Sequence, residues 1–184
     1  MKSMIDIVLT EKKTLLTRFL AYILYQKAFP KEEKKPYRVI RRCEKLGIGR
    51  NFIIKSASGR FLGIAYTLTN GKHVLLDYFA IQKNKRGLGI GAKALADLRE
   101  IFAPLPIMLE IEDPELPCEN REQRQKRKEF YLRCGMKMMD YRISLFGVDM
   151  RILTTGETIE YEIYRDLLLE VLGEYVTNHV ELLM

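Results

Sequence analysis

The chain has 184 residues and a formal net charge of +7 at pH 7. This length suits a single domain that buries a substantial core, and contents of 47% hydrophobic and 30% charged residues argue against a disordered chain. No stretch approaches the roughly 18 uninterrupted apolar residues of a transmembrane helix, and Asp6 and Glu11 interrupt the apolar run that a signal peptide needs. Three widely spaced cysteines argue against a disulfide framework and favour a cytoplasmic location: Cys43, Cys118 and Cys134.

The excess of positive charge predicts an anionic partner, for which nucleic acid and a polyphosphorylated cofactor are the candidates. A solvated, lysine-rich surface explains most of these charges equally well. The sequence lacks a nucleic-acid-binding motif and a clear basic–aromatic platform, so we expect no specific nucleic-acid binding. His73 and His179 stand alone and no Cys/His cluster has ligand spacing, so we predict no metal site. We also expect no membrane partner.

The first half of the chain predicts a strand, two helices and a three-strand meander. Thr10 is expected to cap the first helix, and we expect that helix to pack on the core rather than lie on a membrane. Asn70-Gly71 is a strong signal for a two-residue hairpin turn. The predicted ranges are 4–9 for the first strand, 11–28 and 36–47 for the helices, and 51–57, 60–69 and 72–81 for the meander. The expected core-facing stripe of the first helix comprises Leu16, Phe19, Leu20, Ile23 and Leu24.

The second half predicts a helix that stops before Pro104, followed by a buried strand at 106–111. Because a helix separates this strand from the last strand of the meander, the two are expected to run parallel. An acidic loop at 113–120 precedes a basic helix at 121–134, and Gly135 is the expected residue just beyond that helix. The remaining predicted elements are a hairpin at 138–145 and 148–154 and one helix at 158–181.

These elements predict one α/β (α+β) domain over residues 1–184, with a core at 4–155. Its central mixed, mostly antiparallel sheet is flanked by helices. The C-terminal helical extension is expected to cover the core, cover a substrate cleft or pair with a second subunit in a homodimer.

A basic, glycine-rich turn lies between the strand that ends at Ile81 and the helix that ends at Phe102. Free N–H groups at a helix N-terminus and the helix dipole both favour an anion, and glycine allows the backbone to approach a ligand closely. Arg86, with Lys83 and Lys85 just before it, makes the local field positive. The stretch therefore predicts a phosphate-binding site.

One candidate ligand is a dinucleotide. Gly87, Gly89 and Ala92 match the G-x-G-x-x-G/A fingerprint, and Glu110 follows where a ribose-binding acid belongs. However, the residues QKNKR intervene between the strand and the glycines, and a meander rather than a βαβ unit precedes them. An NAD(P)-binding domain is therefore the less favoured alternative.

The stretch Arg86-Gly87-Leu88-Gly89-Ile90-Gly91-Ala92, behind LDYFAIQKN, resembles the acyl-CoA loop of the GCN5-related N-acetyltransferases (GNAT). Arg86, Gly89 and Gly91 meet that family's Arg/Gln-x-x-Gly-x-Gly/Ala pattern. Further along, FYLRCGM at 130–136 is similar to the family's F-Y-x-x-x-G-F segment, and the order of elements also agrees. Many members carry an asparagine where this chain has Arg124, and whether Asn120 replaces it stays open.

The resemblance implies an N-acetyltransferase that moves the acetyl group of acetyl-CoA to a primary amine by direct attack. It implies that the turn binds the phosphates, and that the backbone of the preceding strand bonds the pantetheine and the thioester oxygen. It also implies that Tyr131 is the general acid that protonates the leaving thiolate, with a core-packing role as the alternative. The implied cofactor-binding residues are Phe79, Ala80, Ile81, Lys85, Arg86, Gly87, Leu88, Gly89, Ile90, Gly91 and Ala92.

The general base that deprotonates the amine is less sharply indicated. Asp77 is an acid in an otherwise apolar strand, so it is either a base with a raised pKa or a carboxylate that is solvated or paired with a lysine. Glu110 and Glu112, which share a face of the next strand, are the other candidates, and either would act directly or through water.

Five carboxylates near the end of that strand suggest a rim that attracts a cationic amine, with a solvated loop as the alternative. They are Glu110, Glu112, Asp113, Glu115 and Glu119. A non-catalytic acyl-CoA-binding domain, which keeps the loop but not the acid, is the alternative function.

Overall fold

The computed structural model describes residues 6–31 and 33–183, which form two compact units. Unit 1 contains the described residues up to Leu68 and the segment Leu76–Ile101. Unit 2 contains Thr69–Leu75 and the described residues from Phe102 onward. The strands of the described chain are hydrogen-bonded in the order β1-β2-β3-β4-β5-β7-β6-β8. The predicted mixed, mostly antiparallel sheet with flanking helices is thereby confirmed.

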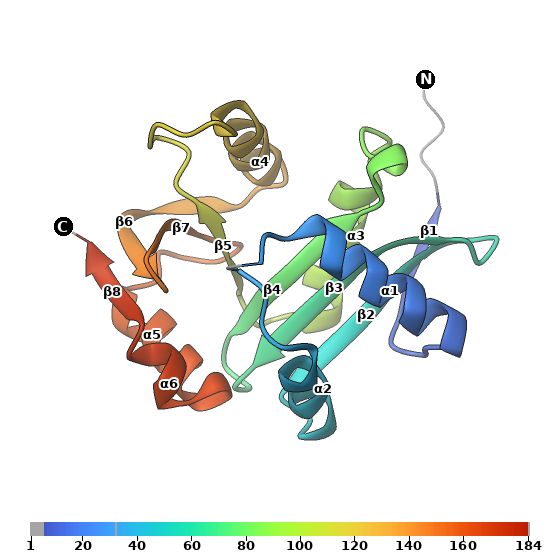
Figure 1. Ribbon diagram of the computed structural model, residues 1–184, viewed down its shortest axis with the longest axis horizontal. Helices are drawn as coiled ribbons and strands as arrows, with labels where there is room; N and C mark the ends of the chain where they lie inside the picture. The colour runs from blue at the N-terminus through green and yellow to red at the C-terminus, as the bar shows by residue number, and fades with distance from the viewer. Residues whose placement is uncertain (1–5, 32, 184) are drawn as a thin grey trace. The chain divides into compact units, whose positions relative to one another are not determined.

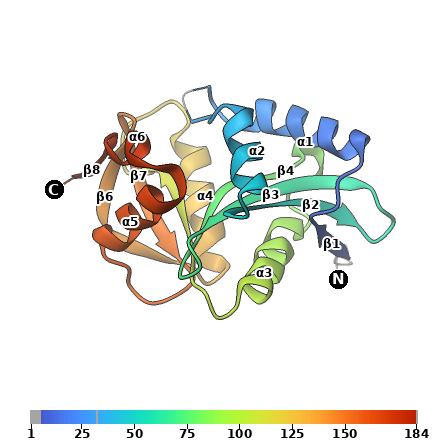
Figure 2. The ribbon, with the colours of Figure 1, turned by 90° about the horizontal axis from the view of Figure 1, so that it is seen from below.

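Unit 1 is built on an antiparallel arrangement of β1 (Ile7–Thr10), β2 (Gly49–Ser56) and β3 (Phe61–Thr69), followed by β4 (Val74–Ile81). Helices α1 (Leu15–Ala28) and α2 (Tyr37–Lys45) cover one face of these strands, and α3 (Ile90–Phe102) covers the other (Figures 1 and 2). An apolar cluster lies between the strands and the helices on each face. The cluster on the side of α1 and α2 comprises Ala21, Tyr25, Ile40, Ile53, Ile64, Tyr66, Tyr78 and Ala80. The cluster on the side of α3 comprises Ile7, Ile54, Leu62, Ile81, Ile90 and Ala94.

Helix α1 differs from its prediction at its cap and on its face. Thr10 ends β1, and the N-cap is Thr14, which forms a capping box with Thr17. The buried positions are Thr17, Ala21 and Tyr25, whereas Leu16 and Phe19 of the expected stripe are 65% and 60% exposed. The predicted stripe was therefore wrong at Leu16 and Phe19, whereas its Leu24 packs partly buried against the core cluster that contains Ala21 and Tyr25.

Two tyrosine hydroxyls hold the connection between α1 and α2. Tyr25 Oη donates to the Lys35 carbonyl at 2.8 Å, and Tyr78 Oη of β4 donates to the Glu33 carbonyl at 2.8 Å while accepting from the Lys35 amide at 2.9 Å. The two rings meet edge to face, with centroids 4.8 Å apart. The charged connection is thus fixed to the sheet through its main chain.

Unit 2 contains β5 (Ile107–Glu112), α4 (Arg121–Arg133), and the hairpin of β6 (Lys137–Leu145) and β7 (Val148–Thr154). As predicted, β5 runs parallel to β4, and their register pairs Val74 with Ile107 and Leu75 with Met108. Strand β7 is antiparallel to both β5 and β6. The division between the units falls within β4, just after the residues that pair with β5.

The C-terminal segment is helical only in part, so the single helix predicted for 158–181 is corrected. Helix α5 (Tyr161–Leu172) ends at Gly173, whose φ of 83° is a left-handed conformation that stops a helix. A short helix, α6 (Glu174–Thr177), and a strand, β8 (Val180–Leu183), follow. Strand β8 pairs antiparallel with β6, so the segment ends as part of the sheet. None of the helices among the described residues is long and apolar enough to cross a bilayer.

Candidate functional site

The glycine-rich turn of unit 1 leaves β4 through a 3-10 turn, Lys83–Lys85, and enters α3 at Ile90. Gly87 and Gly89 have φ values of 75° and 78°, a region that side chains disfavour. A Cβ atom placed on either glycine would have no atom within 4 Å, so both face open space. Because the first i→i−4 bond of α3 runs from Lys93 N to Gly89 O, the amides of the first helical turn precede the helical hydrogen-bond ladder and can bind an anion.

The charged side chains around this turn have different environments. Arg86 Nε donates to the Ile81 carbonyl at 3.2 Å, which ties the guanidinium to the end of β4. Lys93, in the first turn of α3, is instead engaged by Asp97. Lys85 is partly buried and Lys83 is exposed. The positive field at the mouth of α3 therefore comes from Arg86, Lys83 and Lys85.

The end of β4 offers the candidate site main-chain groups rather than side chains. Ala80 and Ile81 are buried, and Phe79 packs partly buried against the α3 layer. Gly63 of β3 approaches so closely that a Cβ there would lie 2.4 Å from the Ala80 carbonyl oxygen. Ile90 is likewise buried in the core, so it can contact a ligand through its amide. The predicted roles of these residues as main-chain ligands are compatible with this packing.

Asp77 has the lysine partner that one interpretation of the sequence anticipated. Its Oδ1 lies 2.6 Å from Lys35 Nζ, and the Asp77 side chain is buried. Lys35 belongs to the connection between α1 and α2, and its Nζ also lies 5.3 Å from the centroid of the Tyr78 ring. The ion pair gives the buried carboxylate a structural reason to be there.

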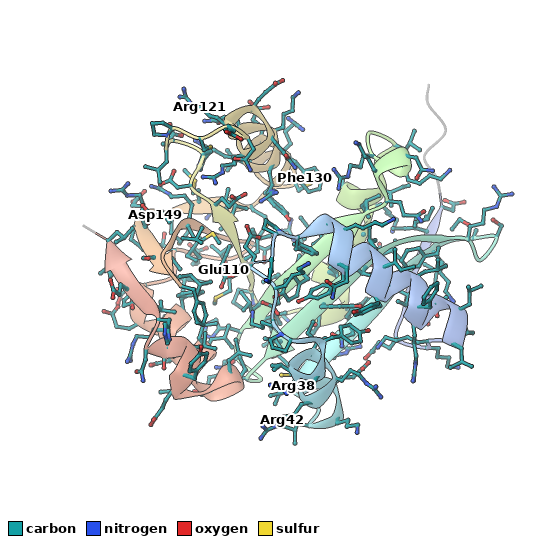
Figure 3. The ribbon with its side chains drawn as sticks, in the orientation of Figure 1. Arg38, Arg42, Glu110, Arg121, Phe130 and Asp149 are labelled. Atoms are coloured by element: carbon teal, nitrogen blue, oxygen red, sulfur yellow. The ribbon has the colours of Figure 1, made fainter. Side chains whose placement is uncertain are left out.

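Glu110 of β5, labelled in Figure 3, has a contact that the sequence did not reveal. Its Oε1 accepts a hydrogen bond of 2.6 Å from Tyr164 Oη, and Tyr164 is fully buried in α5. The two residues are 54 positions apart in the chain. The only feature of the sequence that could have indicated this hydrogen bond is an aromatic residue on the apolar stripe of α5. Such a residue is typical of an ordinary core position.

Glu112, two residues along β5, is held by two arginines of α4. Its Oε1 lies 2.6 Å from Arg124 Nη2 and its Oε2 lies 3.3 Å from Arg127 Nη1. Arg124 Nη1 also donates to the Asp113 carbonyl at 3.2 Å. The residue that stands in place of the family's asparagine therefore ties α4 to the end of β5.

Other carboxylates of the expected acidic rim are also compensated. Asp113 is fully buried and lies 3.9 Å from Arg142 Nη1, and Glu115 Oε1 lies 2.7 Å from Lys128 Nζ. The Lys128 partner lowers the pKa of Glu115. Since cations of α4 and β6 pair with these groups, the rim offers much less net negative charge than the sequence suggested.

Tyr131 is buried in the last turn of α4, beside Phe130, with the two ring centroids 5.0 Å apart. Its carbonyl accepts from the Met136 amide at 3.1 Å, and Gly135 has a φ of 80°, so the predicted glycine ends the helix in a Schellman motif. Burial raises the pKa of the Tyr131 phenol to about 12. The phenol is therefore protonated at neutral pH, as a general acid must be.

No group of three or more His, Cys, Asp or Glu side chains suited to a metal ion occurs within residues 6–31 and 33–183. In the same residues, the three cysteines are free thiols.

The sequence matches no family model and no curated protein. Among solved structures, one described as a GNAT-family acetyltransferase from Bacteroides thetaiotaomicron is similar with a TM-score of 0.76 and 22% identity, over 91% of this chain and 99% of that chain. A spermidine N-acetyltransferase from Vibrio cholerae, in complex with CoA and spermine, gives a TM-score of 0.63 and 12% identity over 81% of this chain and 94% of its own. A dodecameric structure of that Vibrio enzyme gives a TM-score of 0.62 and 12% identity over 81% of this chain and 92% of its own.

In each of these comparisons the similarity covers most of the length of both chains. At such low identities the likeness concerns architecture. The chain has the fold of the GCN5-related N-acetyltransferases.

Proposed function

We propose that this protein is an N-acetyltransferase that moves the acetyl group of acetyl-CoA to a primary amine. The observation that carries the proposal is the structure at the start of α3. Gly87 and Gly89 adopt left-handed conformations and face open space, and the amides of the first helical turn have no i→i−4 carbonyl partner within the helix. On a GNAT fold, an anion bound at this turn would lie where the sequence resemblance puts the acyl-CoA loop.

The residues present fit acetyl-CoA, which would supply the acetyl group as a thioester. The amides of Leu88 to Ala92 and the side chains of Arg86 and Lys85 would hold the pyrophosphate. The main chain of Phe79 to Ile81 would bond the pantetheine and the thioester oxygen. Because that part of β4 presents buried side chains, the binding energy there would come from backbone groups.

In this proposal Tyr131 donates its phenolic proton to the sulfur as the C–S bond breaks. With its pKa raised to about 12 by burial, Tyr131 keeps that proton until negative charge develops on the sulfur. The neighbouring Arg127 lowers the same pKa, and so opposes the effect of burial in the direction that favours proton release.

We further propose Glu110 rather than Asp77 as the base that takes the proton from the ammonium, directly or through water. Asp77 is committed to Lys35 in a buried ion pair, whereas the hydrogen bond from Tyr164 orients the Glu110 carboxylate. A hydroxyl donor positions a carboxylate without adding a positive charge, which would repel an ammonium group.

The acceptor class is a primary amine, and a polyamine is a reasonable first candidate because the Vibrio cholerae neighbour was solved with spermine. An acceptor screen with acetyl-CoA, following the free thiol released, tests the proposal. A thermal-shift comparison of acetyl-CoA with NADH tests the donor. We expect acetylation of at least one amine, and thermal stabilisation by acetyl-CoA but not by NADH. Stabilisation by acetyl-CoA without turnover of any amine would indicate an acyl-CoA-binding domain. Stabilisation by NADH but not by acetyl-CoA would contradict the proposal.

Gly89→Ala should raise the KM for acetyl-CoA about tenfold or more, because the new Cβ would project into the space proposed for the pyrophosphate. Gly59→Ala is the matched control, since Gly59 has a φ of 81° and equally open surroundings in the β2–β3 turn. Both variants should lose roughly 1–2 kcal/mol of stability from backbone strain. Equal KM values in the two variants would remove the turn from the donor site.

Glu110→Gln should lower kcat/KM at neutral pH by about 10²-fold, the range expected for loss of a general base. The defect should shrink as the pH approaches about 10.4, where the amine loses its proton unaided. Asp77→Asn, which breaks the ion pair with Lys35, should reduce stability and leave this pH dependence as in the wild type. A pH-dependent defect that follows Asp77 instead would reverse the assignment.

A further inference from the structure

An exposed apolar surface runs along α1 on the side away from the sheet. Leu15 is 86% exposed, and Leu16, Phe19 and Tyr22 are also exposed, at positions that are neighbours on a helix. Thr17, Ala21 and Tyr25 point the opposite way, into the core of unit 1. The expectation of no membrane contact depended on Leu16 and Phe19 facing the core, and these two side chains face outward. We call these four exposed residues the α1 ridge.

The ridge is bordered by cations. Arg18 and Lys27 are exposed on α1, to either side of the apolar arc at the 100° spacing of helical residues, and Leu15–Ala28 contains no acidic residue. Glu11, the acid nearest in sequence to the ridge, lies 2.6 Å from Arg50, and Glu44 of α2 pairs with Lys13.

Helix α2 adds a second cationic surface on the same side of the sheet. Its buried residues are Ile40 and Cys43, and its outer face carries four exposed cations: Arg38, Arg41, Arg42 and Lys45. Figure 3 shows Arg38 and Arg42 on the outer part of α2. Figure 2 shows α1 and α2 together on the face of β2–β4 opposite α3. An apolar ridge and a row of arginines therefore share one surface of unit 1.

We propose that this surface docks unit 1 on an anionic lipid bilayer. Apolar side chains of the ridge would enter the boundary between headgroups and acyl chains, and the cations of α1 and α2 would contact the anionic headgroups. A bilayer fits a protruding ridge because lipids rearrange around it, whereas a protein partner would have to supply a matching groove. A second copy fits poorly, since an isologous contact would bring the same cations together.

Vesicle co-sedimentation of the full chain tests the proposal, with phosphatidylcholine vesicles that contain either no anionic lipid or about a third phosphatidylserine. Binding to the anionic vesicles should be at least about tenfold stronger, and high salt should weaken it. Arg38→Gln with Arg42→Gln should lower the binding constant about 25-fold, at about fivefold for each cation removed. Leu15→Ser with Phe19→Ser should lower it at least about tenfold.

Ile101→Ser is the matched control, because Ile101 is a partly exposed apolar residue of α3, on the other face of the same strands. It should bind as the wild type does, and circular dichroism should show all variants folded. Equal binding to neutral and anionic vesicles, or wild-type binding by either double variant, would overturn the proposal. A dimer in light scattering that Leu15→Ser with Phe19→Ser dissociates would also overturn it and assign the ridge to a second copy.

Discussion

Replacing Tyr131 with phenylalanine should lower kcat for acetyl transfer by about 10²–10³-fold, the loss expected when a positioned proton donor is removed. The dissociation constant for acetyl-CoA should stay within about twofold of the wild-type value, because the ring remains to pack against Phe130. Steady-state kinetics with the best acceptor, together with calorimetric titration of acetyl-CoA, separates the two effects. An acyl-CoA-binding domain without catalysis would show no turnover to lose.

Tyr141→Phe is the matched control for Tyr131→Phe. Burial raises the pKa of the Tyr141 phenol to about 12 as well, and within the described residues its buried hydroxyl has no hydrogen-bond partner. Removing that hydroxyl should leave kcat unchanged and should not reduce stability. An equal loss of kcat in both variants would indicate a general effect on packing rather than proton donation.

The pH dependence gives a second check on the acid. A phenol with a pKa raised to about 12 carries its proton at every pH below that value. The profile of kcat/KM should therefore rise with pH as the base and the amine deprotonate, without a fall from Tyr131 below about pH 11. A descending limb near pH 9 that disappears in Tyr131→Phe would show a much lower phenol pKa than the structure indicates.

Arg124→Met should destabilise the protein by about 2–3 kcal/mol. Glu112 is 7% exposed, and loss of Arg124 leaves it with the longer, 3.3 Å contact to Arg127. Breaking a buried pair outright costs roughly 3–5 kcal/mol, and the remaining arginine reduces that cost. Urea unfolding measures the change in the free energy of unfolding. The melting temperature should fall by roughly 4–12 °C.

Lys126→Met is the matched control on the same helix, because the pair that Lys126 forms with Glu122 is largely exposed. Such surface pairs contribute little to stability, so no measurable change is expected. A similar loss in both variants would mean that α4 is stabilised by its overall charge. If Arg124→Met instead raised only the KM for acetyl-CoA, Arg124 would be acting as a donor contact.

The elements that sequence predicted well are those specified by neighbouring residues. The positive φ values at Gly71 and Gly135 are local properties of a strand connection and a helix end. The connection at Gly71 spans residues 70–73 rather than the two residues predicted, and its Asn70 Oδ1 accepts from the amides of Lys72 and His73. The glycine-rich turn and the order of elements likewise depend on short patterns. By contrast, Asp77 meets Lys35 across 42 positions and Glu110 meets Tyr164 across 54, and no local pattern specifies such pairs.

Helix α1 shows a different limit of sequence interpretation. Its residues include two candidate faces, and the apolar one was expected inside because burial of large apolar groups is favourable. The structure turns Ala21 and Tyr25 inward, where Tyr25 packs against Tyr66 and Tyr78 and bonds the Lys35 carbonyl. The choice of face depends on this aromatic cluster, which residues distant in the chain assemble.

The way the connection between α1 and α2 is held bears on how freely it can change during evolution. Tyr25 and Tyr78 grip the main-chain groups of Glu33 and Lys35, and main-chain groups are the same whichever side chain is attached. The hydrogen bonds that fix the main chain at positions 33 and 35 therefore do not depend on the identity of these side chains, apart from proline at position 35. Mutational drift or library selection at such a position alters surface chemistry on a conserved backbone, which makes this loop a favourable place for new specificity to arise.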